Sequence, residues 1–522
     1  MSTAPPIVPA VVSDTETDGS LDLSTLTSIT ASDDRARRVA ETFVGAEGVW
    51  LPGGEVRLID SRVDGGVHFD LRAAEGSRPA LAPNSPESLG AHEIRIDRAG
   101  IVVSAASEEG LARGAATIVQ LLADRAGVVS SRVIRDEAAW GWRSLSLDVV
   151  RYFSDTDQVL RVIDLLALYK FNVLHLHLSD NEGWRLEIPG WPQLTPTDAD
   201  FFSLAEYRRI VDYATERFIT VVPEIDLPGH AAAALRAYPE LNPEDAARPA
   251  GPFPIANLST DSPAAWRLVD DVVTTLAENT PGPFIHVGGD EAFGMEAAAH
   301  EAFVEHAIAA VRAAGKKSVG WQETSRANVD AEHTVQFWVD FDIDAPRPEQ
   351  ESGSTATEQI PDDSMAAMIA HFGEAMRDRQ RILDKGLHLV ISPISHSYLD
   401  RPHAESSIHG EQEQERSRIG LAYYPGTPVR DYLEWDPASV LARVDVSRIR
   451  GVEAALWCES IREASDIDAL LLPRLPAVAE VAWSGSRRSD WDGFRDRIAH
   501  HAPLWDAAGW CWFAVDSVPW RR

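Results

Sequence analysis

Cysteine is almost absent from this chain of 522 residues, which contains only Cys458 and Cys511. Two cysteines exclude a disulfide framework, and the sequence has no CxxC pair or Cys/His cluster that would indicate a structural zinc site. A run of about 18 apolar residues, which a membrane-spanning helix needs, is also missing. The first residues lack the basic stretch and apolar core of a secretory signal. We therefore expect a cytoplasmic protein, while a secreted chain trimmed of its signal would read the same.

Basic residues are scarce relative to acidic ones. The 48 Lys and Arg against 81 Asp and Glu give a net charge of −33. Such a charge repels polyanions, which argues against nucleic acids and anionic membrane surfaces as partners. The hydrophobic content of 44% and the charged content of 25% are typical of a soluble globular protein. The length is enough for two or more domains, and the oligomeric state stays open.

The first quarter of the chain divides into two parts. Residues 1–35 are rich in Ser, Thr, Asp and Pro, and we predict that they are partly disordered. Residues 36–138 contain two predicted strands, 93–97 and 100–104, followed by a predicted helix over 108–124. This order indicates a small α+β domain.

Residues 139–522 follow a different pattern, in which strands and helices alternate. Repeated strand–helix units of this length predict an α/β fold, a (β/α)₈ TIM barrel with a C-terminal helix. A capping signature of Ser154 followed by Asp157 predicts the start of the first barrel helix. The polar stretches 341–363 and 401–418 are predicted loops. The predicted strands are 144–150, 172–178, 219–225, 284–287, 318–321, 335–338, 387–391 and 452–457.

Two adjacent carboxylates, Asp290 and Glu291, follow two glycines at the end of the fourth predicted strand. Adjacent side chains on a regular strand point to opposite faces, so both acids reach one pocket only if the backbone bends there. Gly288 and Gly289 permit such a bend. Paired acids in a cleft can hold different protonation states, as glycoside chemistry requires. A solvated acidic turn is the alternative interpretation.

Other strand ends carry carboxylates, one arginine and several tryptophans. Tryptophan faces stack on the C–H face of a pyranose ring, and charged groups bind its hydroxyls, so this composition predicts a sugar site. The residues are Arg151, Asp180, Trp184, Glu224, Asp226, His230, Trp321, Trp338, Tyr398, Asp400, Trp457 and Glu459.

From about residue 90 to 515 the chain resembles the family 20 glycoside hydrolases, the β-N-acetylhexosaminidases. Seven motifs in the family's order carry the resemblance. They are Leu147-Asp-Val-Val-Arg151-Tyr-Phe153, His175-Leu-His-Leu-Ser-Asp180-Asn-Glu-Gly-Trp184-Arg185, Pro223-Glu-Ile-Asp-Leu-Pro-Gly-His230, His286-Val-Gly-Gly-Asp-Glu291, Gly320-Trp-Gln-Glu323, Tyr398-Leu-Asp400 and Trp457-Cys-Glu459.

The resemblance implies removal of a terminal β-linked N-acetylhexosamine, GlcNAc or GalNAc, from an oligosaccharide or glycoconjugate. It implies a retaining reaction without a cofactor or metal, in which the substrate's acetamido oxygen attacks its own anomeric carbon and forms an oxazolinium intermediate. Glu291 matches the general acid, Asp290 the residue that holds the acetamido N–H, and Tyr398 the donor to the acetamido oxygen. The implied sugar-binding residues are Arg151, Glu459 and Asp400 at the ring hydroxyls, Trp321, Trp338 and Trp457 around the acetamido group and ring, Asp180 and His230 as a pair that tunes Glu291, and Tyr423 as the platform for the next sugar.

The sequence departs from the family's usual pattern at four residues in three places. Tyr152 stands where the family usually has His, Asn181-Glu182 where it has Asp-Gln, and Tyr423 where the platform is often Trp. These departures bear on leaving-group preference more than on the chemistry.

Two other functions compete with a glycosidase. His175 and His177 lie on one face of a predicted strand and could bind zinc in a metal-dependent hydrolase, but no matching pattern supplies the other ligands. A non-catalytic sugar-binding barrel would keep the tryptophans and lose the acid, whereas Asp290 and Glu291 are both present.

Overall fold

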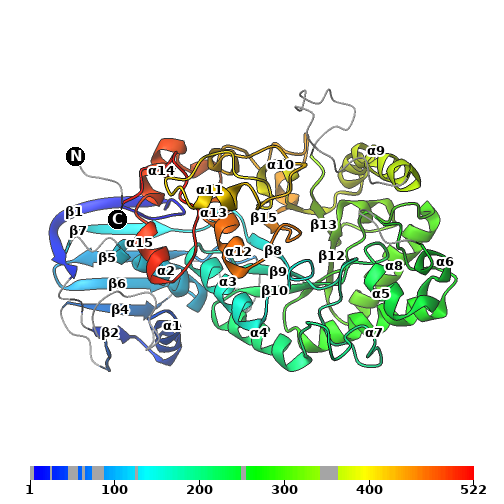
Figure 1. The fold of residues 1–522 in the computed structure, drawn as a ribbon. Helices are drawn as coiled ribbons and strands as arrows, with labels where there is room; N and C mark the ends of the chain where they lie inside the picture. The colour runs from blue at the N-terminus through cyan, green and yellow to red at the C-terminus, as the bar shows by residue number, and fades with distance from the viewer. Residues whose placement is uncertain are drawn as a thin grey trace.

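The computed structural model describes residues 5–23, 26, 28–44, 57–60, 65–72, 87–123, 127–248, 254–340 and 362–521. The chain forms two sheets, a seven-stranded sheet of the N-terminal part and a closed barrel of eight parallel strands (Figure 1). The predicted fold class, a (β/α)₈ barrel preceded by a small α+β domain, is confirmed.

The N-terminal sheet has the strand order β1-β7-β5-β6-β4-β2-β3. Helix α2 (Glu108–Ala123) packs on this sheet and also contacts the barrel helices α3 and α15, so it lies between the two domains. The other elements are α1 (Asp34–Val44), β1 (Ser13–Asp22), β2 (Ser28–Ala31), β3 (Arg57–Leu58), β4 (Gly66–Leu71), β5 (His92–Asp97), β6 (Gly100–Ala105) and β7 (Val128–Asp136).

Part of the segment 1–35, for which we predicted partial disorder, forms regular structure, namely the strands β1 and β2. Strand β1 pairs antiparallel with β7 at the edge of the sheet. Its side chains are mostly exposed, so a polar sequence is compatible with a strand held by its backbone hydrogen bonds. Before β1, Val8 is fully buried, and its backbone exchanges hydrogen bonds of 2.8 and 2.7 Å with the Gln120 side chain.

The barrel closes in the order β10-β11-β12-β13-β14-β15-β8-β9. All eight predicted barrel strands are present, and nearly all of their residues are buried, as expected of a parallel sheet covered on both sides. Their bounds are β8 (Trp142–Asp148), β9 (Val173–His177), β10 (Thr220–Glu224), β11 (Phe284–His286), β12 (Lys317–Trp321), β13 (Thr334–Phe337), β14 (His388–Ile391) and β15 (Ile449–Leu456).

Helices surround the barrel and return to the N-terminal domain at the end of the chain (Figure 1). No helix in the described ranges combines the length and apolar character needed to cross a membrane. The helices are α3 (Thr156–Leu168), α4 (Leu204–Glu216), α5 (Ala232–Ala237), α6 (Pro243–Ala246), α7 (Pro263–Asn279), α8 (Ala297–Ala313), α9 (Asp362–Lys385), α10 (Ile394–Ser397), α11 (Gln412–Arg416), α12 (Ala464–Leu471), α13 (Arg474–Ser484), α14 (Trp491–Ile498) and α15 (Ala502–Ala507).

Two local predictions need correction. Helix α3 is capped by Asp155, whose side chain accepts from the backbone of Gln158 in a reciprocal capping box, and not by Ser154. The predicted loop over 341–363 lies largely outside the described residues, and helix α9 already begins at Asp362. The polar stretch 401–418 is irregular, as predicted, apart from the short helix α11.

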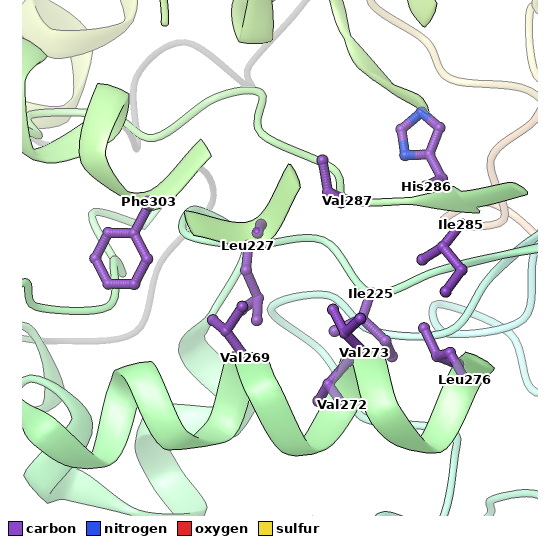
Figure 2. Close-up of a pocket in the computed structure, with 11 residues that line it drawn as sticks. Ile225, Leu227, Val269, Val272, Val273, Leu276, Ile285, His286, Val287 and Phe303 are labelled. Atoms are coloured by element: carbon purple, nitrogen blue, oxygen red, sulfur yellow. The ribbon is translucent and has the colours of Figure 1, made fainter. Parts of the chain in front are cut away.

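A small apolar cavity lies between α7 and the strands β10 and β11 (Figure 2). Val269, Val272 and Leu276 of α7 face Ile225 and neighbouring apolar side chains across it. Its volume of about 20 Å³ is enough for a single water but not for a sugar, and its lining is almost entirely apolar. It is a packing cavity and not a ligand site.

Candidate active site

The polar residues that follow the barrel strands meet at one end of the barrel. In parallel strands the carboxyl ends share one face, which is the catalytic face of known barrels. Arg151 follows β8, Asp180 follows β9, His230 follows β10 and Glu291 follows β11. Ion-pair distances link Arg151 to Asp180, Asp180 to His230, and His230 to Glu291.

The backbone bends after β11 as the glycines predict. Gly288 has φ +69°, Gly289 φ +101° and Glu291 φ +42°, all in the left-handed region. A Cβ atom on Gly288 would lie 1.9 Å from Asp226 Oδ1, so no other residue fits there. The Gly289 N–H donates to the same oxygen at 3.0 Å. The bend turns both acids toward His230, whose Nε2 lies 3.5 Å from Glu291 Oε2 and 3.9 Å from Asp290 Oδ2.

Asp180 is the central acceptor of the site. Its carboxylate receives Arg151 Nη2 at 2.7 Å, His177 Nε2 at 2.8 Å and His230 Nδ1 at 2.9 Å. Burial alone would raise the pKa of Asp180, but Arg151 and His230 outweigh burial and hold it well below its ordinary value. Burial also lowers the pKa of His230, and the carboxylates of Asp180 and Asp226 reverse this and raise it well above its ordinary value. His230 is therefore an imidazolium that can hold Glu291.

Asp290 and Asp226 form a pair of buried carboxyl groups. Burial, and then the Asp226 carboxylate, raise the pKa of Asp290 well above its ordinary value. Burial likewise raises the pKa of Asp226 to about 6. Like charges in one buried site cannot both ionise easily, so this pair holds a proton at a pH where a solvated carboxyl would not. Asp290 Oδ1 is buried and has no donor among the described residues, which leaves an acceptor for a ligand N–H.

Arg151 lies among carboxylates. Its Nη1 is 3.4 Å from Asp148, and its Nε donates to Glu182 at 3.0 Å. Its guanidinium also stacks on Trp457 at 5.4 Å. Burial, which Arg151 partly offsets, raises the pKa of Glu459 to about 7. The departure at Glu182 thus adds a half-exposed carboxylate to the arginine that we predicted to bind sugar hydroxyls.

Trp321, Trp338, Trp457 and Tyr398 form one aromatic cluster, which we call the aromatic pocket. Trp321 lies 6.2 Å from Trp338 and 5.9 Å from Trp457, and Tyr398 lies 6.0 Å from Trp457 between ring centroids. Burial, followed by the charges of Asp400 and Asp290, raises the pKa of Tyr398 well above its ordinary value, so its phenol is a hydrogen-bond donor.

Three further predicted site residues, Asp400, Tyr423 and Trp184, differ in burial and in hydrogen bonding. Both carboxylate oxygens of Asp400 are buried and find no donor in the part of the chain that the structure describes, as expected of a group that accepts from ligand hydroxyls. Tyr423 is 48% exposed and its ring contacts Tyr424, which packs on the aromatic pocket. Trp184 instead belongs to the main core, where its indole N–H donates to the Leu186 carbonyl.

A polar network inside the barrel lies beneath the site. Glu224 accepts from Trp321 Nε1 at 2.7 Å and lies 2.5 Å from His177 Nδ1 and 2.9 Å from His286 Nδ1. His175 joins it directly, with its Nε2 3.2 Å from Glu224 Oε2, and extends it to Glu453, whose Oε1 lies 2.9 Å from His175 Nδ1. His175, Glu224 and His286 thus have the spacing of metal ligands, which the sequence did not reveal because they come from three strands. Here protein donors already engage both oxygens of Glu224.

A barrel whose catalytic face combines a buried acid pair, an imidazolium and an aromatic pocket defines a glycoside hydrolase. Comparison with known proteins identifies the family of glycoside hydrolases. The model of the glycosyl hydrolase family 20 catalytic domain matches residues 140–357 and 350–486, and that of domain 2 of the same family matches residues 4–137. The chain therefore belongs to glycosyl hydrolase family 20, the β-N-acetylhexosaminidase family, as the motifs indicated.

Individual proteins of this family are similar to the chain over most of its length. The chain is 34% identical over 477 residues to a β-N-acetylhexosaminidase of Cellulomonas fimi, with 87% of each chain covered. The structure of the family 20 β-N-acetylhexosaminidase of Streptomyces coelicolor A3(2) matches with a TM-score of 0.81 and 30% identity over the full length of both chains. A mutant Streptomyces plicatus β-hexosaminidase in complex with the product GlcNAc matches with a TM-score of 0.79 and 30% identity, covering 100% of this chain and 99% of that one.

Proposed function

We propose that this protein is a retaining exo-glycosidase that removes a terminal, non-reducing β-linked N-acetylhexosamine by substrate-assisted catalysis. Most retaining glycosidases use a second carboxylate as nucleophile, and family 20 is among the exceptions. The observation that carries the proposal is the pairing of Glu291, whose Oε2 lies 3.5 Å from His230 Nε2, with a buried Asp290 oxygen that has no hydrogen-bond donor among the described residues. One group suits the glycosidic oxygen, and the other suits an acetamido N–H.

In this mechanism Glu291 protonates the leaving oxygen while the substrate's acetamido oxygen attacks the anomeric carbon. The C–O bond to the leaving group breaks as the new C–O bond closes the oxazolinium ring. Asp290 accepts the acetamido N–H and opposes the positive charge, and the Tyr398 hydroxyl donates to the acetamido oxygen. Glu291 then takes a proton from water, which opens the ring with net retention. Holding the nucleophile in place can contribute roughly 7–11 kcal/mol.

The other predicted residues bind the sugar in this proposal. Arg151 and Glu459 hold ring hydroxyls with Asp400, whose two oxygens lack protein donors. The aromatic pocket encloses the acetamido group of the substrate. Asp180 and His230 keep Glu291 oriented. Tyr423, exposed at the rim, offers its ring to the next sugar.

A panel of p-nitrophenyl β-glycosides with and without the N-acetyl group tests this proposal. We expect turnover of the GlcNAc and GalNAc compounds and little or none of the plain glucoside. A thiazoline mimic of the intermediate should inhibit strongly, because it resembles the closed ring. Faster cleavage of the plain glucoside would rule out the substrate-assisted mechanism.

The variant Asp290→Asn tests the role that the proposal assigns to Asp290. Removing the charge that supports ring closure should lower kcat on the N-acetyl substrate by roughly 100-fold or more, in the range seen for one lost electrostatic group. Asp212→Asn, on the outer helix α4, is the matched control and should leave the rate unchanged. An Asp290→Asn rate equal to wild type would remove Asp290 from its assigned role.

A further inference from the structure

We propose that helix α9 helps to set which N-acyl group the enzyme accepts. In this proposal His371 and Phe372 are positioning residues that hold Trp338 of the aromatic pocket in place. This inference rests on the proposed function, since it concerns the same pocket. Neither residue belongs to the seven sequence motifs that carry the family resemblance. Both lie on the described helix that begins at Asp362.

A chain of hydrogen bonds connects α9 to Trp338. His371 Nε2 donates to Glu323 Oε1 at 3.0 Å, and Trp338 Nε1 donates to Glu323 Oε2 at 3.1 Å. All three side chains are buried. Buried hydrogen bonds to a carboxylate are costly to leave unmade, so the Trp338 indole and the His371 imidazole share one rigid acceptor.

Ring contacts connect α9 to the pocket a second time. Phe372 packs edge-on against Trp338 at 5.9 Å between ring centroids, and Ala375 lies in the same apolar cluster as Trp321 and Tyr398. His371 packs edge-on against Phe293 at 5.3 Å. The Phe293 N–H donates to the Glu291 carbonyl, so this contact also reaches the loop that carries the acid pair.

Helix α9 is fixed to the segment that carries Glu323. That segment is the 3₁₀ turn η3 (Gln322–Arg326). Arg326 contacts both oxygens of the Asp378 carboxylate at 3.0 and 2.7 Å, and Lys385 Nζ donates to the Ser325 carbonyl at 2.8 Å. The turn and the helix therefore hold each other in place, and through Glu323 and Phe372 they support the Trp338 side chain.

The expected consequence concerns the size of the acyl group. A tight apolar pocket discriminates against one additional methylene by about 10- to 200-fold. This discrimination requires that the side chains lining the pocket keep their positions when a larger acyl group binds. Loosening the connection between α9 and Trp338 should make room for a larger acyl group and should misplace the acetamido nucleophile.

The experiment compares p-nitrophenyl N-acetyl- and N-propionyl-β-glucosaminide with wild type, His371→Ala and Phe372→Leu. For both variants we expect kcat/KM on the N-acetyl compound to fall about 10-fold, mainly through kcat, because the nucleophile is misplaced. We expect the ratio of N-propionyl to N-acetyl kcat/KM to rise at least about threefold. His371→Gln retains an N–H donor for Glu323 and should restore most of the wild-type ratio.

Gln380→Ala, an exposed change on the same helix, is the matched control and should leave the ratio at the wild-type value. The inference is overturned if His371→Ala and Phe372→Leu both keep the wild-type ratio, even if their melting temperatures fall, because a merely structural role would lower stability without changing selectivity. Failure of the proposed function is seen separately, in a wild-type enzyme that does not cleave the N-acetyl compound.

Discussion

Asp180 connects the two ends of the site through a single carboxylate. It accepts from Arg151, assigned to the sugar hydroxyls, and from His230, which lies beside Glu291. The third donor, His177, is itself held by Glu224. A substitution at Asp180 would therefore disturb both sugar binding and the acid.

The acid itself gives the first prediction at this scale. Glu291→Gln should lower turnover of substrates with poor leaving groups by about 10²- to 10⁴-fold, since these need protonation in the transition state. Dinitrophenyl substrates, which need little protonation, should lose far less. Rates on the two kinds of leaving group, with substrate binding measured separately, check this. An equal loss on both kinds would argue against Glu291 as the acid.

The Asp226–Asp290 pair gives a prediction for pH dependence. Burial and the Asp226 charge raise the pKa of Asp290, and Asp290 must be ionised to support ring closure. Activity should therefore be lost as pH falls through this raised pKa. Asp226→Asn removes the like charge, so the acidic limb of kcat/KM should move to lower pH. A limb that stays in place, or moves to higher pH, would contradict the coupling of the two groups.

Which single residues could be predicted depended on where their partners lie in the sequence. Asp290 and Glu291 were found because the glycines and both acids are adjacent. Glu224 was noted as an acid at a strand end, but its contacts with His286 and Trp321 come from strands 62 and 97 residues away, and no local pattern predicts them. His371 has no local signal, because it follows a polar insertion and reaches the site through residues distant in the sequence, Glu323 and Phe293.

Elements were easier to predict than their ends. The barrel strands are apolar runs buried on both faces, which alternate with helices in a fixed order. The ends depend on single hydrogen bonds, and at α3 the cap is Asp155 and not the neighbouring Ser154. Strand β1 was missed because an exposed edge strand has no apolar pattern.

The turn after β11 gives the prediction for this scale. Gly288→Ala would place a methyl group within 1.9 Å of Asp226 Oδ1 at φ +69°, so the turn must shift. We expect kcat/KM to fall by about 100-fold, because a displacement of 1 Å at the acid pair can cost that much, and the melting temperature to fall as well.

Gly373→Ala is the matched control for that change. Gly373 lies in helix α9, and a Cβ atom there meets no atom within 4 Å. The control should stabilise the protein by about 0.5–1 kcal/mol and leave activity unchanged. A Gly288→Ala enzyme as active as this control would show that the turn tolerates the side chain.

For the whole molecule, the buried histidines predict how stability changes with pH. Burial lowers the pKa of His177, but the carboxylates of Glu224 and Asp180 outweigh it and raise the pKa to about 10. Burial also lowers the pKa of His175, and the carboxylates of Glu453 and Glu224 outweigh it and raise this pKa to about 9. An unfolded histidine titrates near 6.5, so this stabilisation is complete below pH 6.5 and is lost as pH rises through about 9 to 10.

Calorimetry should therefore find a lower melting temperature at pH 10 than at pH 6. The net charge of −33 also contributes through self-repulsion as pH rises. Repeating the scans in about 1 M salt, where the Debye length is ~3 Å, removes that surface contribution but not the buried one. A melting temperature independent of pH under those conditions would contradict charged histidines in the barrel.

Residues 7–10, near the start of the described chain, are hydrogen-bonded both to α2 and to the late helices α13 and α14. Val8 bonds to Gln120 of α2, Arg497 of α14 donates to the Ile7 carbonyl, and Ser484 donates to the carbonyl of Ala10. During synthesis, residues 5–10 leave the ribosome hundreds of residues before Ser484 and Arg497 exist. The contacts of residues 7–10 with α13 and α14 can therefore form only after most of the barrel has been translated. Until then the opening segment can bond to α2 alone, and a chain stalled inside the barrel lacks the hydrogen bonds that join this segment to the last helices.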